Sequence, residues 1–177
     1  MGDETTGSRS APTPGPVRVV FDRHLDVVFA SPLATALSAA FSVGNNLARS
    51  LFLNPEFRTV LEEWEQSASH LATMLRSNIR RFGKDPRFDD LVGELGALSP
   101  PFVEHWAGTE VAPRATDIVH FFHPMTGTQA YVCRLEPDGD ERVEMRWSPA
   151  DGPCRTALHA LWVRTRQLEE TRRVSAR

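Results

Sequence analysis

The sequence has little of what marks several large classes of protein. It contains only two cysteines in 177 residues, Cys133 and Cys154, which are too few for a disulfide framework. No uninterrupted apolar run approaches the roughly 18 residues that a membrane span needs, and the chain does not start with a basic stretch followed by an apolar one. The formal net charge is only -3, which gives no global field for attracting nucleic acid or an anionic membrane. We therefore expect a cytoplasmic protein with no membrane contact and no direct DNA binding.

Signatures of catalysis and of cofactor binding are also missing. The sequence has no G-x-G-x-x-G, G-x-x-x-x-G-K, H-E-x-x-H, G-x-S-x-G or C-x-x-C pattern. His120 and His123 are three residues apart in an expected strand, so they point to opposite faces, and one metal ion could not take both without a bulge. We expect neither a metal nor a cofactor.

What is present is typical of one folded domain. Hydrophobic residues make up 41% and charged residues 24% of the chain, close to globular averages. Residues 1–16 hold no bulky apolar side chain after Met1 and are expected to form a disordered leader. Residues 17–171 should form the domain, and residues 172–177 a basic tail.

Two kinds of hydrophobic pattern divide the domain. Short β-branched and aromatic runs predict strands over residues 17–21, 25–30, 116–123, 128–135 and 141–148. Apolar residues at helical spacing predict helices over residues 32–41, 45–53, 56–82, 86–98, 100–106 and 154–171. Three of these helices should begin with a capping side chain followed by proline, at Ser31-Pro32, Asp85-Pro86 and Ser99-Pro100.

The clearest helical pattern covers residues 56–82. Its apolar positions recur every three or four residues, and Glu62, Glu63 and Glu65 lie between them near the start. We interpret the segment as one continuous helix on which these three carboxylates form a solvated face.

The order of elements predicts an α+β fold. A PAS-like, five-stranded antiparallel sheet satisfies it, with helices inserted between the second and third strands and a helix at the C-terminus, provided that the first hairpin pairs beside the last strands. Such a sheet curves around a cavity between its concave face and the helices, and cavities of this kind are typical small-molecule sites.

Seven side chains are candidates for binding a ligand in such a cavity. Six are aromatic or sulfur-containing, and the seventh, Arg49, follows Asn46 by three residues, so both could project from one helical face toward a carboxylate or a loop. The candidates are Arg49, Trp106, Phe121, Tyr131, Cys133, Met145 and Trp147. Each also has a structural interpretation, because large aromatic side chains and small thiols are commonly core residues.

Several short segments, in this order and approximate spacing, resemble the ligand-binding domain of MmyB-like transcription regulators over residues 17–162. They are Asn46-Leu47-Ala48-Arg49, Phe52-Leu53-Asn54-Pro55, Arg58, Trp64-Glu65, Leu91-Val92-Gly93-Glu94-Leu95, Ser99-Pro100, Phe102, Trp106-Ala107, His123-Pro124 and Gly127. The resemblance implies a PAS-like sensor that holds a hydrophobic, fatty-acid-like molecule and signals to an Xre-type helix-turn-helix. Regulators of this kind are often associated with antibiotic biosynthesis.

Three hypotheses about function remain open. In the first, the chain is a stand-alone sensor, because only sixteen residues precede the first expected strand. It binds an apolar small molecule and acts through a protein partner, as a homodimer or as a heterodimer with a regulator. In the second, the same cavity serves an enzyme without a motif, such as a cyclase or isomerase, with His120, Tyr131, Cys133 and Arg49 as candidates. In the third, the chain titrates full-length relatives by heterodimerising with them.

Overall fold

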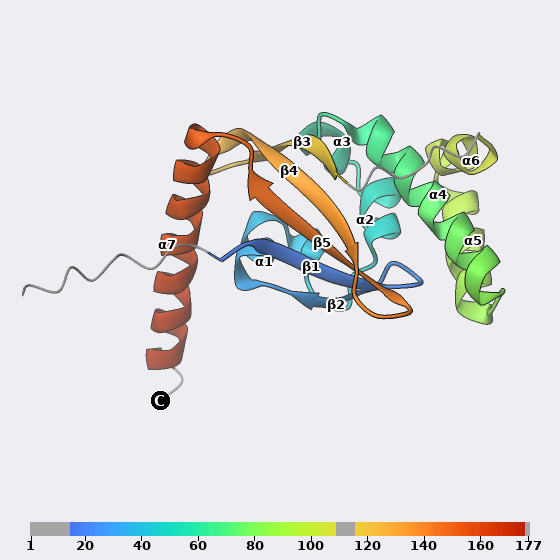
Figure 1. Ribbon diagram of the computed structural model, residues 1–177, viewed down its shortest axis with the longest axis horizontal. Helices are drawn as coiled ribbons and strands as arrows, with labels where there is room; N and C mark the ends of the chain where they lie inside the picture. Colours follow the sequence, from blue (N-terminus) through green and yellow to red (C-terminus); the bar gives the residue numbers. More distant parts are fainter. Residues whose placement is uncertain (1–14, 109–115, 176–177) are drawn as a thin grey trace, which may run out of the picture.

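A computed structural model describes residues 15–108 and 116–175 of the chain (Figure 1). Most of the leader expected at residues 1–16 lies outside these residues, as do the last two residues of the expected basic tail. The elements follow the expected order of two strands, a group of helices, three strands and a final helix.

The five strands form a single antiparallel sheet. They are β1 (Val17–Asp22), β2 (Val27–Ala30), β3 (Thr116–His123), β4 (Gly127–Pro137) and β5 (Arg142–Pro149). Their order in the sheet is β2-β1-β5-β4-β3, so the first hairpin pairs with β5, the last strand of the chain. The PAS-like α+β fold expected from the sequence is thereby confirmed.

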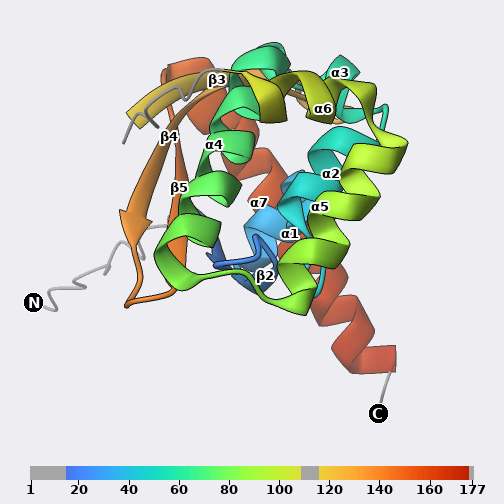
Figure 2. The same cartoon turned by 90° about the vertical axis from the view of Figure 1, so that its right-hand side faces the viewer.

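The helices cover one face of the sheet and its two ends. They are α1 (Pro32–Leu37), the short 3-10 helix η1 (Ala39–Phe41), α2 (Leu47–Leu53), α3 (Phe57–Val60), α4 (Trp64–Phe82), α5 (Pro86–Leu98), α6 (Pro100–Ala107) and α7 (Gly152–Ser175). Helices α4, α5 and α6 gather at one end of the sheet, and α7 stands at the other (Figures 1 and 2). One continuous hydrophobic core joins the sheet to the helices.

Side-chain caps start the helices where the sequence predicted them. Ser31 accepts a hydrogen bond from the backbone N–H of Ala34, Asp85 from that of Phe88, and Ser99 from that of Phe102. In each case a proline follows the cap, and its missing N–H would have had no partner in the first helical turn. These short-range signals fix the helix starts without help from tertiary packing.

The first hairpin differs from the prediction, because β2 begins at Val27 rather than at residue 25. Asp22 accepts hydrogen bonds from the backbone N–H groups of His24 and Asp26, at 2.9 and 3.0 Å, which closes the turn. Leu25 adopts a positive φ of 67° within that turn, and its side chain is fully buried. The apolar side chain of Leu25 had suggested a strand residue. It is buried instead within the turn, where the backbone adopts this unusual conformation.

The expected continuous helix over residues 56–82 is wrong, because the chain leaves the helical path between α3 and α4. Leu61 forms an isolated antiparallel bridge with Phe121, and the N–H of Glu62 donates to the carbonyl of His120 at 3.1 Å. Residues 61 and 62 therefore pair with the outer edge of β3. The helical spacing of the side chains continues across a backbone that is locally extended.

The C-terminal helix is longer than predicted. Helix α7 runs to Ser175, so Arg172 and Arg173 belong to its last turns rather than to a tail. Its buried side chains, Cys154, Leu158 and Leu161, lie in the N-terminal half, which packs against α1 and β4. None of the helices in the described part of the chain is long and apolar enough to cross a membrane.

An ion-pair cluster crosses the outer face of the sheet. Glu144 of β5 accepts hydrogen bonds from Arg18 at 2.7 and 2.8 Å and from Arg146 at 2.6 and 2.8 Å. The hydrogen bond from Arg18 is the largest cause of a lowered Glu144 pKa, about 2, and it outweighs the opposing effect of burial. The pair joins β1 to β5, the contact that attaches the first hairpin to the rest of the sheet.

We predict that Glu144→Gln lowers the free energy of unfolding near pH 7 by about 1 kcal/mol, as expected for a bidentate but solvent-screened pair. Since the folded pKa is depressed, the carboxylate stabilises the fold fully above its unfolded value of 4.5, and this stabilisation is lost as pH falls toward about 2. Urea unfolding at a series of pH values should show a shallower acid loss in the variant. Glu104→Gln, an exposed change on α6 away from the cluster, is the control; equal acid dependence in all three proteins would contradict the assignment.

Candidate functional site

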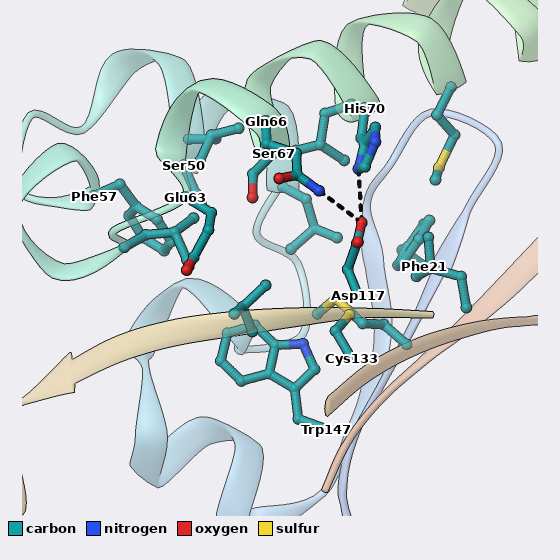
Figure 3. A pocket seen from close by; sticks show the side chains of 18 of the residues that line it. Phe21, Ser50, Phe57, Glu63, Gln66, Ser67, His70, Asp117, Cys133 and Trp147 are labelled. Atoms are coloured by element: carbon teal, nitrogen blue, oxygen red, sulfur yellow. Dashed lines mark hydrogen bonds and ion pairs between the residues drawn. The ribbon is translucent and has the colours of Figure 1, made fainter. Parts of the chain in front are cut away.

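A partly enclosed cavity of about 120 Å³ lies between the inner face of the sheet and helices α2, α3 and α4 (Figure 3). Most of its lining is apolar, from Phe21, Val119, Leu135 and Trp147 on the strands to Leu71 and Met74 on α4. A smaller polar group lies along one side and consists of Ser50, Glu63, Gln66, Ser67, His70 and Asp117. The cavity thus has an apolar body and a polar margin, as small-molecule sites commonly do.

Trp147 is the central side chain of the sheet side of the cavity. It is only 5% exposed and contacts three rings, at centroid distances of 5.4 Å to Phe41, 5.5 Å to Phe121 and 5.4 Å to Tyr131. The contacts to Phe41 and Phe121 are edge-on, an arrangement that aromatic quadrupoles favour. Packing from three sides fixes the indole ring in one orientation.

Asp117 of β3 organises the polar margin. Its Oδ2 accepts a hydrogen bond from Gln66 Nε2 at 3.0 Å and lies 3.6 Å from His70 Nδ1 (Figure 3). Gln66 and His70 are four residues apart on α4, so they share one face of that helix. These contacts tie α4 to β3 across the margin of the cavity.

A second carboxylate, Glu63, lies where α3 ends and α4 begins. It accepts hydrogen bonds from the backbone N–H of His120 at 2.7 Å and pairs with Nδ1 of the same residue at 2.5 Å. Desolvation opposes ionisation of Glu63, but its hydrogen bonds with His120 outweigh it and lower the Glu63 pKa. The hydrogen bond that the His120 ring donates to Glu63 raises the His120 pKa in turn, so both groups favour their charged forms.

Cys133 of β4 is a protonated thiol within the apolar part of the cavity. Burial raises its pKa to about 12, with a smaller opposing effect of the Trp147 side chain. Cys133 is half-buried, whereas the second cysteine, Cys154, is fully buried, and desolvation raises the Cys154 pKa as well. Neither sulfur is a thiolate at neutral pH, and the thiolate is the nucleophilic form.

Three of the seven side chains expected to bind a ligand line the cavity. Cys133 and Trp147 are cross-strand partners on β4 and β5, and Met145 lies two residues before Trp147 on the same face. The structure brings these three together because strand side chains alternate between faces. Direct contact with a ligand remains a prediction for each of them.

Two of the remaining candidates lie away from the cavity. The Arg49 side chain donates a hydrogen bond to Glu94 of α5 at 2.6 Å, and this ion pair joins α2 to α5. The Asn46 side chain accepts a hydrogen bond from the backbone N–H of Arg49 at the start of α2. Trp106 on α6 stacks against Phe102 at 5.2 Å. Neither side chain is among those that line the cavity.

The last two candidates support the cavity from behind its lining. Phe121 packs between Phe57 at 6.3 Å and Trp147 at 5.5 Å, both of which line the cavity. Tyr131 lies against Trp147 and reaches Cys154 of α7, and desolvation raises the Tyr131 pKa. These rings set the positions of the lining residues without facing the cavity.

The polar margin of the cavity was not predicted from the sequence. We expected Glu63 on a solvated face, but the break before α4 turns it toward His120 and the cavity. The sequence did contain a signal for this margin. Glu63, Gln66 and His70 recur at helical spacing, next to the helix face on which Leu75 is buried. Their partner Asp117 lies far along the chain, so the spacing alone could not show what they face.

Within the part of the chain that the structure describes, two groups of side chains have the donors to hold a metal ion. Asp22, His24 and Asp26 form one, and Glu62, Glu63 and His120 the other, with ligand atoms within 4.8 Å of one another. In the first group His24 pairs with Asp85 at 3.0 Å and Asp26 pairs with Arg87; in the second, Glu63 holds His120 directly. These donors already serve ion pairs between elements, which is a structural role.

The four residues named for an enzyme do not converge. Of His120, Tyr131, Cys133 and Arg49, only Cys133 lines the cavity, and its thiol is protonated at neutral pH. Arg49 is engaged by Glu94, and His120 by Glu63 at the outer edge of β3. The structure places no nucleophile and base within hydrogen-bond reach of one another among these four residues.

Known proteins similar to this chain point to one family. The family model described as "MmyB-like transcription regulator ligand binding domain" matches residues 11–161. Among solved structures, the chain is similar to the PAS domain of the Cronobacter turicensis RpfR quorum-sensing receptor in complex with C12:0. The two share 14% sequence identity with a TM-score of 0.37, and the match covers 80% of this chain and 100% of that chain. No curated protein matches the chain in sequence.

We predict that Cys133 reacts very slowly with iodoacetamide in the native protein. With a pKa of about 12, the thiolate fraction near pH 8 is on the order of 10⁻⁴. Mass spectrometry of timed samples should show little labelling at Cys133 until urea unfolds the chain. Rapid labelling of the native protein would contradict the buried thiol and would revive a nucleophilic role.

Proposed function

This chain belongs to the MmyB-like transcription regulator ligand binding domain family, and we propose that it is a sensor whose cavity holds an apolar small molecule. The observation that carries the proposal is a cavity with a largely apolar lining at the centre of the fold, between α4 and the sheet. Protein interiors normally pack without voids larger than a water molecule, so such a space needs an explanation.

The size of the cavity supports a guest larger than water. A single water occupies roughly 10–15 Å³ on a comparable measure, and the cavity holds about 120 Å³. Empty apolar cavities of this order bind small apolar molecules rather than water. A short acyl chain or a compact apolar compound fits these properties.

Burial of an apolar guest would provide useful affinity without a sequence motif. Each buried methylene contributes about 0.8 kcal/mol, so an eight-carbon chain gains roughly 6 kcal/mol. Association itself costs about 4 kcal/mol or more, which leaves weak to moderate binding for a plain hydrocarbon. Polar contacts at the margin then decide which apolar molecule binds best.

A bound guest would act on the contacts that join α4 to β3. Asp117 holds Gln66 and His70 of α4 at the margin of the cavity, so a guest that enters between α4 and the sheet strains or completes these bonds. We propose that the resulting shift of α4 passes to a protein partner, either a second copy of the chain or a regulator. Two expectations from the sequence stay predictions. They are the cytoplasmic location and, from the resemblance, the link to antibiotic biosynthesis.

Ser67→Phe, on the cavity side of α4, should abolish ligand binding while the fold survives. Its new ring occupies the space that the guest needs, and Ser67 is only partly exposed. Tryptophan fluorescence during titration with octan-1-ol, with Trp147 in the cavity wall, should saturate in the natural protein and not in the variant. The ligand should also raise the thermal midpoint of the natural protein alone.

Ser77→Phe on the exposed face of the same helix is the matched control. It adds the same ring to α4 away from the cavity and should leave the titration unchanged. If both serine variants bind as the natural protein does, or if the natural protein shows no saturable binding, the sensor proposal fails.

A further inference from the structure

The indole N–H of Trp147 is a buried donor that meets no oxygen or nitrogen acceptor among the described residues, and the Cys133 sulfur is its one nearby partner there. Its side chain lines the cavity and is only 5% exposed. In Figure 3 the indole nitrogen is turned toward Cys133, whose sulfur is at best a weak acceptor. Buried N–H groups almost always find an acceptor, so this one marks a position where a guest oxygen would be favoured.

The charge of the cavity lining narrows the choice of that oxygen. Glu63 and Asp117 contribute two carboxylates, whereas the described lining residues include neither Lys nor Arg. His70 is the one described lining residue able to carry a positive charge, and it already lies 3.6 Å from Asp117. Glu63 is paired with His120, so Asp117 is the carboxylate that opposes a charged guest. A guest carboxylate would lose its hydration and meet that charge of its own sign.

We propose that the cavity selects an uncharged apolar molecule whose carbonyl or ether oxygen accepts a hydrogen bond from Trp147 Nε1, in preference to a fatty-acid carboxylate. The inference rests on the proposed function and deepens it by naming the chemical class of the ligand. A ketone, ester or lactone oxygen accepts a hydrogen bond from the indole N–H at little desolvation cost, because such groups are weakly hydrated.

Three eight-carbon probes separate the possibilities. Octan-2-one carries an acceptor without charge, octanoate carries the charge, and octane carries neither. Calorimetric titration of the natural protein should give the tightest binding for octan-2-one, with octane weaker by roughly three- to tenfold, as one hydrogen bond predicts. Octanoate should bind weakest of the three near neutral pH.

The Trp147 indole proton reports the contact directly. In two-dimensional ¹H–¹⁵N spectra its resonance, assigned by triple-resonance experiments on the natural protein, should move downfield with octan-2-one and not with octane. The variant Trp147→Phe should reduce octan-2-one binding roughly three- to tenfold more than octane binding, because both probes feel the smaller ring but only one loses a hydrogen bond. The spectra decide the matter if the variant fails to fold.

Asp117→Asn tests the part played by charge. Removing one charge from the margin should strengthen octanoate binding relative to octane binding roughly threefold or more, a ratio that a general change in the cavity would not alter. Glu104→Gln, an exposed change on α6 outside the cavity, is the control and should alter neither.

Different results overturn different claims. Octanoate binding more tightly than octan-2-one, or a Trp147 resonance that stays in place while octan-2-one binds, overturns the ligand class and leaves the sensor proposal standing. Binding of octan-1-ol without binding of octan-2-one does the same. Failure of every apolar probe to bind removes the proposed function, and the ligand class falls with it.

Discussion

The cavity depends on the short extended segment between α3 and α4. The bridge of Leu61 to Phe121 and the hydrogen bond from Glu62 to His120 attach this segment to the outer edge of β3. Helix α4 consequently starts at the edge of the sheet and passes over its inner face, while Asp117 holds it through Gln66 and His70. Space remains between the helix and the strands because the helix is fixed at this edge rather than pressed onto the sheet.

Local signals in the sequence were sufficient for the order of the five strands and for the capped helix starts. The pairing of the first hairpin beside β5 was a condition of the predicted fold, and the structure confirms it. The local signals failed where a distant residue decides the backbone. Residues 61–63 keep helical spacing, yet β3, some 60 residues later, provides the hydrogen bonds that replace the helix there. Leu25 likewise takes a positive φ inside a turn closed by Asp22, which a β-branched and aromatic pattern cannot reveal.

The candidate site was partly predictable for the same reason. Cys133, Met145 and Trp147 line the cavity because alternation along a strand is a local property. Arg49 instead pairs with Glu94 on another helix, a contact set by helix packing, and Trp106 stacks on Phe102 one turn earlier in its own helix. The polar margin joins α4 to β3, so no short window of the sequence contains both Asp117 and its partners.

The central claim is that the space between α4 and the sheet is a true apolar cavity that accepts a guest. Diffraction from crystals held under xenon tests it most directly, because xenon enters dry apolar cavities without needing a particular shape or hydrogen bond. The account predicts a xenon peak beside Trp147 and Met145, on the α4 side of the strands. A structure in which side chains fill this region and xenon binds elsewhere or not at all would contradict it.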